Sequence, residues 1–519
     1  MRVCLLSEGS TESKSLLGNK GGELVEMKKL GLPVPPAMII TTDAWREYRA
    51  NHGLTDDLKK EIAEKLKMLQ DESKKTFGSQ SNPLLVSVRS GAPVSMPGML
   101  DTILDLGLND VTVTGLAEQG RNETFAYDCY QRFVSSFGKV ALGVNGNKFE
   151  EILAKHGRKS DLQVKDLKEL VTEYKALVEK ETGKRLFNDV FDQLFLAVGA
   201  VFDSWFSERA VTYRQAQNIP NDLGTAVLVQ SMVFGNMGND SGTGVLFSRD
   251  PSTGEKRPYG EFMLNAQGED LVSGIRTPEP IDSLREKLPG IYIELVRISE
   301  TLEKHFKDMQ DTEFTIEKGR LYVLQTRSGK RTPQASARIA FDMYKEGIIA
   351  REDAVRIVRS IPLEELTVQH KDPRIKLQTL AKGLPASPGI ATGVVVFDSN
   401  EAVRLSEEGK KVILFRPQTS PEDFRGVLVA EGVVTARGGM TSHAAVITRS
   451  YGKPCVVGCE EIKIDVEAAR FMVKRGQSQT VTVASGDVVS VDGTEGLVIL
   501  GEIPHVAHSV SGYVKELLT

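Results

Sequence analysis

One histidine of the chain, His443, stands in a sequence context that suits nucleophilic chemistry. It follows an apolar run beginning at Val433, expected to be a buried strand, and a loop with two adjacent glycines, and a helix is expected to begin at Ala444. The glycines let the backbone approach a ligand, and the helix start offers unpaired N–H groups that Thr441 and Ser442 are expected to cap. This context suits a phosphorylated imidazole, whereas a histidine in an ordinary polar loop is simply exposed.

A second group of polar side chains is predicted to share one face of a β-hairpin. Asp311 and Glu313 alternate along one apolar run, and Gln325 and Arg327 alternate along the next. A three-residue loop at 317–319, with its glycine in the left-handed conformation, sets a register that brings all four together, whereas a two-residue loop would separate them. Carboxylates beside an amide and a guanidinium are what a magnesium triphosphate requires, although carboxylates on a strand are more often only solvated.

Two cations stand beside glycine-rich segments in the first hundred residues. Residues 18–22 are expected to form a flexible loop that leads into a short helix from Glu23, where Lys20 could meet a phosphate. The segment is not a Walker A loop, because the spacing and the Lys-Ser/Thr ending of that motif are absent. Arg89 ends a strand predicted over 83–90, a position from which a guanidinium can reach a triphosphate. A solvated surface lysine and a structural salt bridge are the competing interpretations.

A glycine-rich loop at 235–244 is predicted to connect two antiparallel strands. The flanking runs, 225–234 and 244–250, have the composition of strands. The main-chain N–H groups of such a loop could close over phosphates as a nest. An ordinary long hairpin loop is the alternative.

Length and composition restrict the class of protein. The 519 residues are enough for about three domains, and 65 lysine and arginine residues against 70 acidic ones leave no basic surface that indicates nucleic acid. No apolar run reaches the ~18 residues of a membrane helix, and the N-terminus lacks a signal-peptide core, so a soluble cytoplasmic protein without membrane partners is expected. The four cysteines lack the spacing of a zinc site and are expected to be reduced thiols.

We expect an α/β and α+β multidomain chain. Residues from about 115 to 210 have helical periodicity, and their aromatic stripes are interpreted as core packing. Thr55 is expected to cap a separate amphipathic helix. Beyond residue 384, apolar strands alternate with short helices, which predicts a compact α/β unit that carries His443. The expected segments are 1–335, a helical hinge at 336–384, 385–503, and a C-terminal tail at 504–519.

Two motifs of the chain resemble those of pyruvate phosphate dikinases. They are GGMTSHAAVITR at 438–449, followed by YGKPCVVG, and SVRSGAPVSMPGMLDTILDLG at 87–107. The Met-Thr-Ser before His443 is similar to the dikinases, whereas the related phosphoenolpyruvate synthases tend to have Arg-Thr-Cys. The resemblance covers essentially the whole chain and implies an ATP-grasp nucleotide-binding domain with a helical insertion, followed by a swivelling phosphohistidine domain. Family members continue into a barrel for pyruvate and phosphoenolpyruvate, which we expect to be missing here or to be a separate polypeptide.

The resemblance also implies roles for particular residues. His443 would take a pyrophosphoryl group from ATP, and orthophosphate would then remove the outer phosphate, with AMP and pyrophosphate as products. Magnesium is the expected cofactor, and a monovalent cation is a further candidate. Catalysis is expected of His443, Lys20 and Arg89, and metal binding of Asp311, Glu313 and Gln325. The nucleotide contacts would include these metal ligands, Lys20, Arg89, Arg327 and Gln230, with Thr243 and Gly244 in a lid over the phosphates.

Other functions remain open on the sequence. They are a phosphoenolpyruvate synthase-like enzyme, a dikinase for another small molecule, and a non-enzymatic phosphocarrier or regulatory protein. A different small-molecule acceptor would need a substrate domain, for which the chain offers no room. A carrier that had lost catalysis should also have lost some of the nucleotide-site residues, yet all of them are present.

Overall fold

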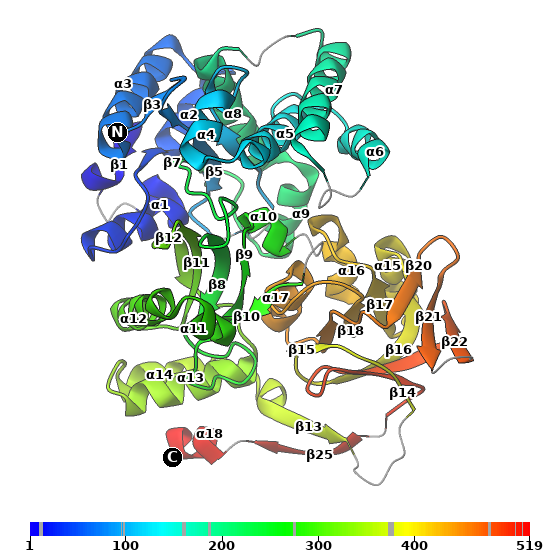
Figure 1. Cartoon of the computed structure of the whole chain (residues 1–519). Helices are drawn as coiled ribbons and strands as arrows, with labels where there is room; N and C mark the ends of the chain where they lie inside the picture. Colours follow the sequence, from blue (N-terminus) through cyan, green and yellow to red (C-terminus); the bar gives the residue numbers. More distant parts are fainter. Residues whose placement is uncertain are drawn as a thin grey trace. The chain divides into compact units, whose positions relative to one another are not determined.

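The computed structural model forms two compact units (Figure 1). It describes residues 1–9, 14–94, 96, 99–157, 162–184, 188–272, 277–371, 378–475, 479–503, 505–510 and 512–519. Unit 1 comprises residues 1–241, 316–318 and 322–325, and unit 2 comprises residues 242–315, 319–321 and 326–519. The chain is thus a mixed α/β protein with more than one domain, while the domain boundaries expected from the sequence stay a prediction.

Unit 1 is built on a five-stranded antiparallel sheet. Its strand order is β1-β2-β7-β5-β6, so the last strand to be added along the chain, β7, lies in the middle. Every residue of β7 is buried, which is the burial pattern of a strand covered on both faces. The strands are β1 (Val3–Leu5), β2 (Ala37–Ile40), β5 (Val86–Gly91), β6 (Thr102–Leu106) and β7 (Ala226–Ser231), with β3 (Thr76–Phe77) and β4 (Pro83–Leu84) forming a separate short pair.

The predicted helical segment of unit 1 is confirmed. Thr55 also caps its helix as expected, since its hydroxyl accepts a hydrogen bond from Leu58 N at 3.3 Å. The helices are α1 (Lys14–Lys29), α2 (Thr42–Asn51), α3 (Asp56–Ser73), α4 (Thr112–Gly120), α5 (Glu123–Val140), α6 (Gly146–His156), α7 (Val164–Thr182), α8 (Val190–Asp203) and α9 (Glu208–Ala216).

Among the described residues, one bent pair of helices has the length and composition of a membrane span. Within the part of the chain that the structure describes, no single helix is both long and apolar enough to cross a membrane. Residues 190–206 and 208–216, which are bent by 44° at their junction, meet the length and composition requirements only when they are taken together.

The hairpin predicted around residues 235–244 is wrong, because its two strands belong to different sheets. Its order is β10-β9-β8-β11-β12, so β8 pairs with β9, whereas β7 belongs to the sheet of unit 1. The glycine-rich loop therefore links strands of different sheets. The strands are β8 (Gly242–Phe247), β9 (Tyr259–Leu264), β10 (Glu279–Pro280), β11 (Gln310–Glu317) and β12 (Arg320–Ser328), and the helices beside them in the sequence are α10 (Gly268–Val272), α11 (Leu284–Lys287) and α12 (Pro289–Phe306).

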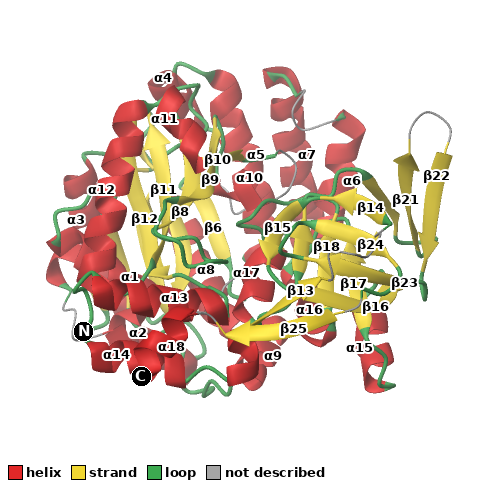
Figure 2. Cartoon of the chain, turned by 90° about the horizontal axis from the view of Figure 1, so that it is seen from below, coloured by secondary structure: helices red, strands yellow, loops and turns green. Residues whose placement is uncertain are grey.

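The second sheet of unit 2 has eight strands in the order β14-β24-β23-β16-β17-β18-β19-β15 (Figure 2). Its middle strands β16, β17, β18 and β19 are parallel to their neighbours in this group, as expected for strands joined through helices. The strands are β14 (Thr379–Lys382), β15 (Leu384–Ser387), β16 (Ile390–Val396), β17 (Val412–Arg416), β18 (Gly432–Thr435), β19 (Cys455–Val457), β23 (Val488–Asp492) and β24 (Leu497–Leu500). The helices are α15 (Ser399–Glu407), α16 (Phe424–Val429) and α17 (His443–Ser450), and β20 (Ile462–Asp465), β21 (Arg470–Arg475) and β22 (Gln479–Ala484) form a small separate sheet.

The predicted hinge and tail are paired with each other. β13 (Thr367–Lys371) pairs antiparallel with β25 (His505–Val510). α18 (Gly512–Leu518) buries Val514 and Leu517 against an apolar cluster of α13 (Pro333–Lys345) and α14 (Arg351–Arg359), and Figures 1 and 2 both show these three helices side by side. α13 and α14 supply the helices expected of the segment 336–384.

Candidate active site

His443 is presented at the carboxyl end of a parallel strand. β18 lies between β17 and β19, and the chain passes from Thr435 through a seven-residue loop, 436–442, into α17, whose first residue is His443. Ligand-binding loops gather at this end of parallel strands, because the chain turns there from strand to helix. The strand, loop and helix predicted around His443 are confirmed, with the helix beginning one residue earlier than expected.

The expected capping of α17 is wrong. Ser442 occupies the N-cap position, but its side chain makes no cap hydrogen bond. The Thr441 hydroxyl also turns away from the helix and donates to Glu261 Oε2 at 2.8 Å. The hydroxyl therefore serves a contact with another strand instead of the first turn of α17.

Glu261, on β9, holds the loop that precedes His443. Its Oε1 accepts a hydrogen bond from Met440 N at 2.7 Å, and its Oε2 accepts one from Thr441 N at 3.1 Å. Glu261 is 6% exposed. Gly439 is required beside it, since a Cβ there would lie 2.4 Å from Oε1. No sequence pattern indicated Glu261, because it lies 180 residues before the loop in an ordinary apolar strand.

Arg449 fixes the same loop from inside its own helix. This fully buried guanidinium donates to Met440 O at 2.7 Å and to Ala386 O at 3.3 Å, and it lies 5.7 Å from the centre of the Phe247 ring. The Met440 residue is thus held at its N–H by Glu261 and at its carbonyl by Arg449. Arg449 stands in the motif around His443, but its structural role could not be inferred from that motif.

The His443 imidazole is neutral and free of hydrogen bonds to the described residues. Both ring nitrogens are buried, and neither has a partner in that part of the chain. Burial lowers the pKa of His443 to about 4, and the carboxylates of Asp423 and Glu422 act in the opposite direction without cancelling this effect. A neutral imidazole with unengaged nitrogens is the form that attacks phosphorus, since the protonated ring has no lone pair to offer.

Asp311 and Arg327 meet on the first sheet of unit 2. Arg327 Nε donates to Asp311 Oδ2 at 2.7 Å, whereas Asp311 Oδ1 is buried and has no hydrogen-bond partner among the described residues. Burial raises the pKa of Asp311, and the Arg327 charge opposes that rise. A buried carboxylate oxygen without a donor fits a hard divalent cation, and Glu313, two residues along β11, offers a second carboxylate on the same face.

The loop between β11 and β12 is one residue shorter than predicted. β11 ends at Glu317 and β12 begins at Arg320, so the turn has two residues, Lys318 and Gly319, and not three. Both residues have positive φ, 49° and 71°, which confirms the left-handed glycine but not the loop length. A two-residue loop was expected to separate the side chains of Asp311 and Arg327, but the two side chains form an ion pair.

Within unit 1, Arg89 and Gln325 are brought together. Arg89 lies near the carboxyl end of β5, two residues before its last residue Gly91, and its guanidinium donates to the Gln325 side-chain oxygen at 3.3 Å. Gln325 is buried, so its amide is held in one direction. The carbonyl oxygen retains a second lone pair with which it could coordinate a cation.

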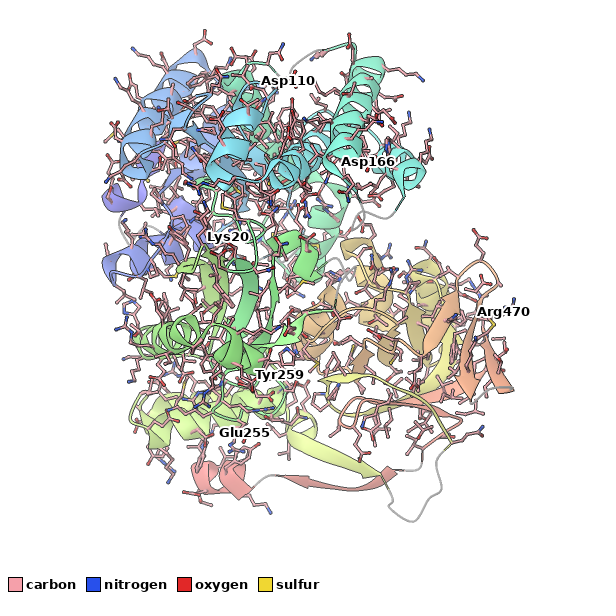
Figure 3. The ribbon with its side chains drawn as sticks, in the orientation of Figure 1. Lys20, Asp110, Asp166, Glu255, Tyr259 and Arg470 are labelled. Carbon is pink, nitrogen blue, oxygen red and sulfur yellow. The ribbon has the colours of Figure 1, made fainter. Side chains whose placement is uncertain are left out.

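Lys20 lies in a helix that is broken once, and not in a flexible loop as predicted (Figure 3). The helix α1 has a non-helical residue at Gly18, with φ 72°, so Lys20 stands in the first turn after the break. A Cβ at Gly18 would lie 1.6 Å from the Gly91 carbonyl oxygen, and Asn19 N donates to Ala92 O at 2.9 Å. The break is therefore set by close contact with the end of β5, the strand that carries Arg89.

Three residues predicted to contact the nucleotide lie in strands, where they contact other parts of the protein. Thr243 and Gly244 are part of β8 and not of the glycine-rich loop; the Thr243 hydroxyl donates to Phe314 O at 3.1 Å, and a Cβ at Gly244 would lie 2.4 Å from the Phe314 ring. Gln230 is buried in β7, where its amide donates to Pro35 O at 3.4 Å. Thr243 and Gly244 therefore lie outside the loop predicted to close over the phosphates, whereas Gln230 lies on β7, the strand that leads into that loop, as predicted.

A cavity of about 810 Å³ in unit 1 contains none of the nucleotide-site residues. It lies beside α2, α3 and α8 and is lined by, among others, Tyr48, Lys59, Phe195 and Asp203. The Tyr48 hydroxyl donates to Asp203 at 2.9 Å, so two of its polar groups satisfy each other.

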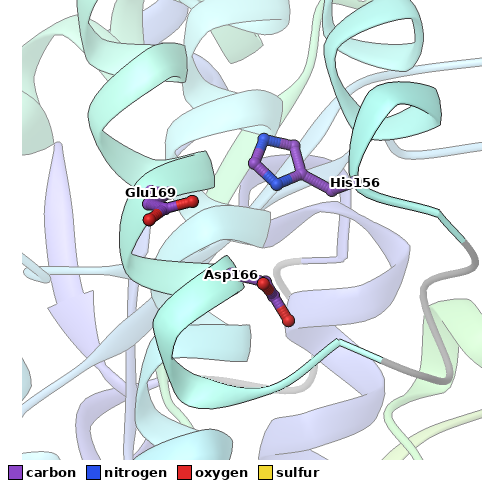
Figure 4. A group of neighbouring side chains, drawn as sticks. All are labelled: His156, Asp166 and Glu169. Atoms are coloured by element: carbon purple, nitrogen blue, oxygen red, sulfur yellow. The ribbon is translucent and has the colours of Figure 1, made fainter.

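Another group of potential metal ligands lies between α6 and α7 (Figure 4). The ligand atoms of His156, Asp166 and Glu169 all lie within 4.8 Å of one another. However, His156 Nε2 contacts Glu173 Oε1 at 3.1 Å, and Asp166 accepts a hydrogen bond from Gln163 N at 2.9 Å as part of the N-terminal capping of α7. These contacts explain the cluster as a helix junction.

Two known protein families match this chain, one over its first part and one over the part that contains His443. Residues 55–292 and 283–348 match the family model "Pyruvate phosphate dikinase, AMP/ATP-binding domain". Residues 408–496, which include His443, match "PEP-utilising enzyme, mobile domain". The fold and site thus define a chain with an ATP-binding domain followed by a mobile domain of phosphoenolpyruvate-utilising enzymes.

The chain belongs to the pyruvate phosphate dikinase family. It is 45% identical over 531 residues to the pyruvate, phosphate dikinase of Rhizobium meliloti, covering 99% of this chain and 59% of the relative. It is 47% identical to that of Clostridium symbiosum (99% and 60%) and 48% identical to the chloroplastic enzyme of Mesembryanthemum crystallinum (99% and 54%). The chain therefore spans between about half and three fifths of the length of these curated relatives.

Proposed function

We propose that this chain carries the phosphohistidine-forming half of a pyruvate, phosphate dikinase. A nitrogen of His443 attacks the β-phosphorus of ATP, the bond to the bridging α–β oxygen breaks, and AMP leaves. Orthophosphate then attacks the outer phosphorus of the pyrophosphoryl group, pyrophosphate leaves, and one phosphoryl group remains on His443. The observation that supports this proposal best is a neutral imidazole with unengaged nitrogens at the start of α17.

The remaining site residues would hold and neutralise the nucleotide. Phosphoryl transfer depends mainly on positioning and charge neutralisation, which suits Lys20, Arg89 and Arg327 as phosphate ligands. Asp311, Glu313 and Gln325 would hold magnesium, which when bound neutralises phosphate charge; the unpartnered Asp311 oxygen supports this role. Contacts from Gln230, Thr243 and Gly244 stay a prediction, and a monovalent cation remains a candidate. ATP, orthophosphate, AMP and pyrophosphate are the small-molecule partners.

The finer architecture also belongs to the proposal. We assign the ATP-binding domain to the ATP-grasp type and residues 385–503 to a swivelling phosphohistidine domain. The phosphoryl group would pass to pyruvate, giving phosphoenolpyruvate, on a barrel elsewhere in a longer polypeptide or on a separate one. A cytoplasmic protein without nucleic-acid or membrane partners fits these reactants, because all of them are small and soluble.

The proposed reaction is tested by labelling the protein with ATP that carries ³²P either at the β-phosphate or at the γ-phosphate. With magnesium and [β-³²P]ATP, acid-labile label should enter the protein whether or not orthophosphate is present. Label from [γ-³²P]ATP should enter without orthophosphate and should leave as pyrophosphate when orthophosphate is added. His443→Ala should abolish both labels, whereas His156→Ala, at the junction of α6 and α7, should leave them unchanged. Label that persists in His443→Ala would contradict the proposal.

A further inference from the structure

Glu261 makes a contact that the transfer chemistry does not require. Its two carboxylate oxygens accept three hydrogen bonds from the loop before His443: one from Met440 N, one from Thr441 N and one from the Thr441 hydroxyl. Charge-assisted hydrogen bonds to a carboxylate are roughly twice as strong as neutral ones. Burial of Glu261 and Thr441 removes the competition from water.

The contact fixes the peptide that aims His443. Because Arg449 holds the Met440 carbonyl at 2.7 Å while Glu261 holds the Met440 N–H, this residue is restrained on both sides. Gly439 admits the carboxylate, since any larger residue would place a Cβ within 2.4–2.7 Å of its oxygens and carbon. Thr441 is two residues from His443, so a shift of this peptide moves the start of α17.

The carboxylates of Asp423 and Glu422 act on the His443 imidazole, and Asp423 is itself paired with Arg416 at 3.2 Å. A phosphoryl group would add between about one and two further negative charges to the start of α17, by analogy with other phosphorylated side chains. The loop that Glu261 holds through Thr441 would then carry an additional anion two residues farther along the chain, and like charges in a buried region repel each other.

We propose that Glu261 is a positioning residue that holds the His443 loop while the histidine is unmodified and releases it once the histidine is phosphorylated. The second half of this inference rests on the proposed phosphorylation of His443. Glu261 thereby couples the chemical state of the histidine to the freedom of its loop. An enzyme that must carry its phosphoryl group to a second site gains from such coupling, because the loop is rigid during attack and mobile afterwards.

Hydrogen–deuterium exchange of the full chain tests the holding role without any reaction. In the unmodified protein, the amides of Met440 and Thr441 should be protected. Glu261→Gln keeps the size but provides only one acceptor oxygen, so the two amides should exchange about tenfold faster, as expected for a lost bond to a charged acceptor. Glu255→Gln is the matched control: Glu255 precedes the same strand, is exposed (Figure 3), and pairs only with Arg257 at 3.4 Å among the described residues.

The same measurement after phosphorylation tests the release. Phosphorylated wild-type protein should exchange Met440 and Thr441 amides at the rate of Glu261→Gln, and phosphorylation of Glu261→Gln should add little. Protection of these amides in a folded Glu261→Gln protein would overturn the holding role, and protection that survives phosphorylation in the wild type would overturn the release. If no label reaches His443, the proposed function fails, yet the comparison of the unmodified proteins still decides the role of Glu261.

Discussion

Two buried carboxylates on the same sheet of unit 2, Glu261 and Asp311, differ in what surrounds them. Glu261 accepts three hydrogen bonds, all from groups of a single loop. Asp311 has one oxygen on Arg327, while the other has no partner among the described residues. Because uncompensated buried oxygens are costly, the first carboxylate is satisfied within the protein, and the second fits the proposed role of a metal ligand.

This difference predicts that substitution of Asp311 slows the phosphorylation of His443, whereas substitution of Glu261 loosens the loop that precedes His443. Asp311→Asn keeps the shape but removes the charge that a magnesium ion needs. We expect ATP-dependent labelling of His443 to fall roughly 100-fold, as for other electrostatic contacts to a transferring group. Exchange of the Met440 and Thr441 amides should stay at the wild-type rate. A labelling rate within twofold of wild type would remove Asp311 from the metal site.

A second test concerns the cation that faces Asp311. Arg327→Met leaves the carboxylate buried beside an apolar side chain, and the free energy of unfolding should fall by about 3 kcal/mol at pH 7. Without Arg327, burial raises the pKa of Asp311 further above the value in the unfolded chain, so the native state binds the proton more readily. Stability is then lost as the pH rises, and urea unfolding should show a larger deficit at pH 8 than at pH 5.

The double variant Asp311→Asn, Arg327→Met is the control for that experiment. It removes both charges together, so most of the lost stability should return. A double variant as unstable as Arg327→Met alone would show that the deficit comes from packing of the long arginine side chain and not from the unpaired charge.

The local part of the site could be predicted from the sequence. The strand, loop and helix around His443 follow from a short apolar run, two glycines and a helix start, all within about twenty residues. Asp311 and Arg327 were also correctly brought together, although the assumed turn was one residue too long. Lys318 adopts φ 49°, and lysine is not among the residues that normally indicate a turn with two positive φ angles.

The long-range part could not be predicted. β7 and β8 have the composition of a hairpin, and only the strand order shows that β7, whose residues are all buried, is the central strand of another sheet. Nothing in the sequence near Glu261 indicates that its carboxylate meets residues 440 and 441, because that contact depends on how β9 and α17 pack. The partner of Thr441 was therefore missed, and helix capping was assigned to it instead.

Gly439 offers a steric way to break the Glu261 contact without changing its charge. Gly439→Ala would place a methyl group 2.4 Å from Glu261 Oε1, so the carboxylate and the loop must move apart. We expect about tenfold faster exchange of the Met440 and Thr441 amides and a loss of about 1–2 kcal/mol in unfolding free energy. Gly268→Ala is the control, since a Cβ there meets nothing within 4 Å and its φ is not positive. Shortening the acid with Glu261→Asp should relieve part of the clash.

The smallest expected effect is an absence of titration at His443. Burial lowers its pKa to about 4, against about 6.5 for an exposed histidine, so the ring stays neutral from pH 8 down to about pH 5. The ¹³Cε1 resonance that disappears in His443→Ala should be flat over this range while exposed histidines shift. Between pH 6.5 and 4 the unfolded chain binds the proton and the native chain does not, so this histidine lowers stability as the pH falls. A midpoint near 6.5 would mean that the ring is solvated and that its loop is not held in the arrangement that Glu261 and Arg449 define.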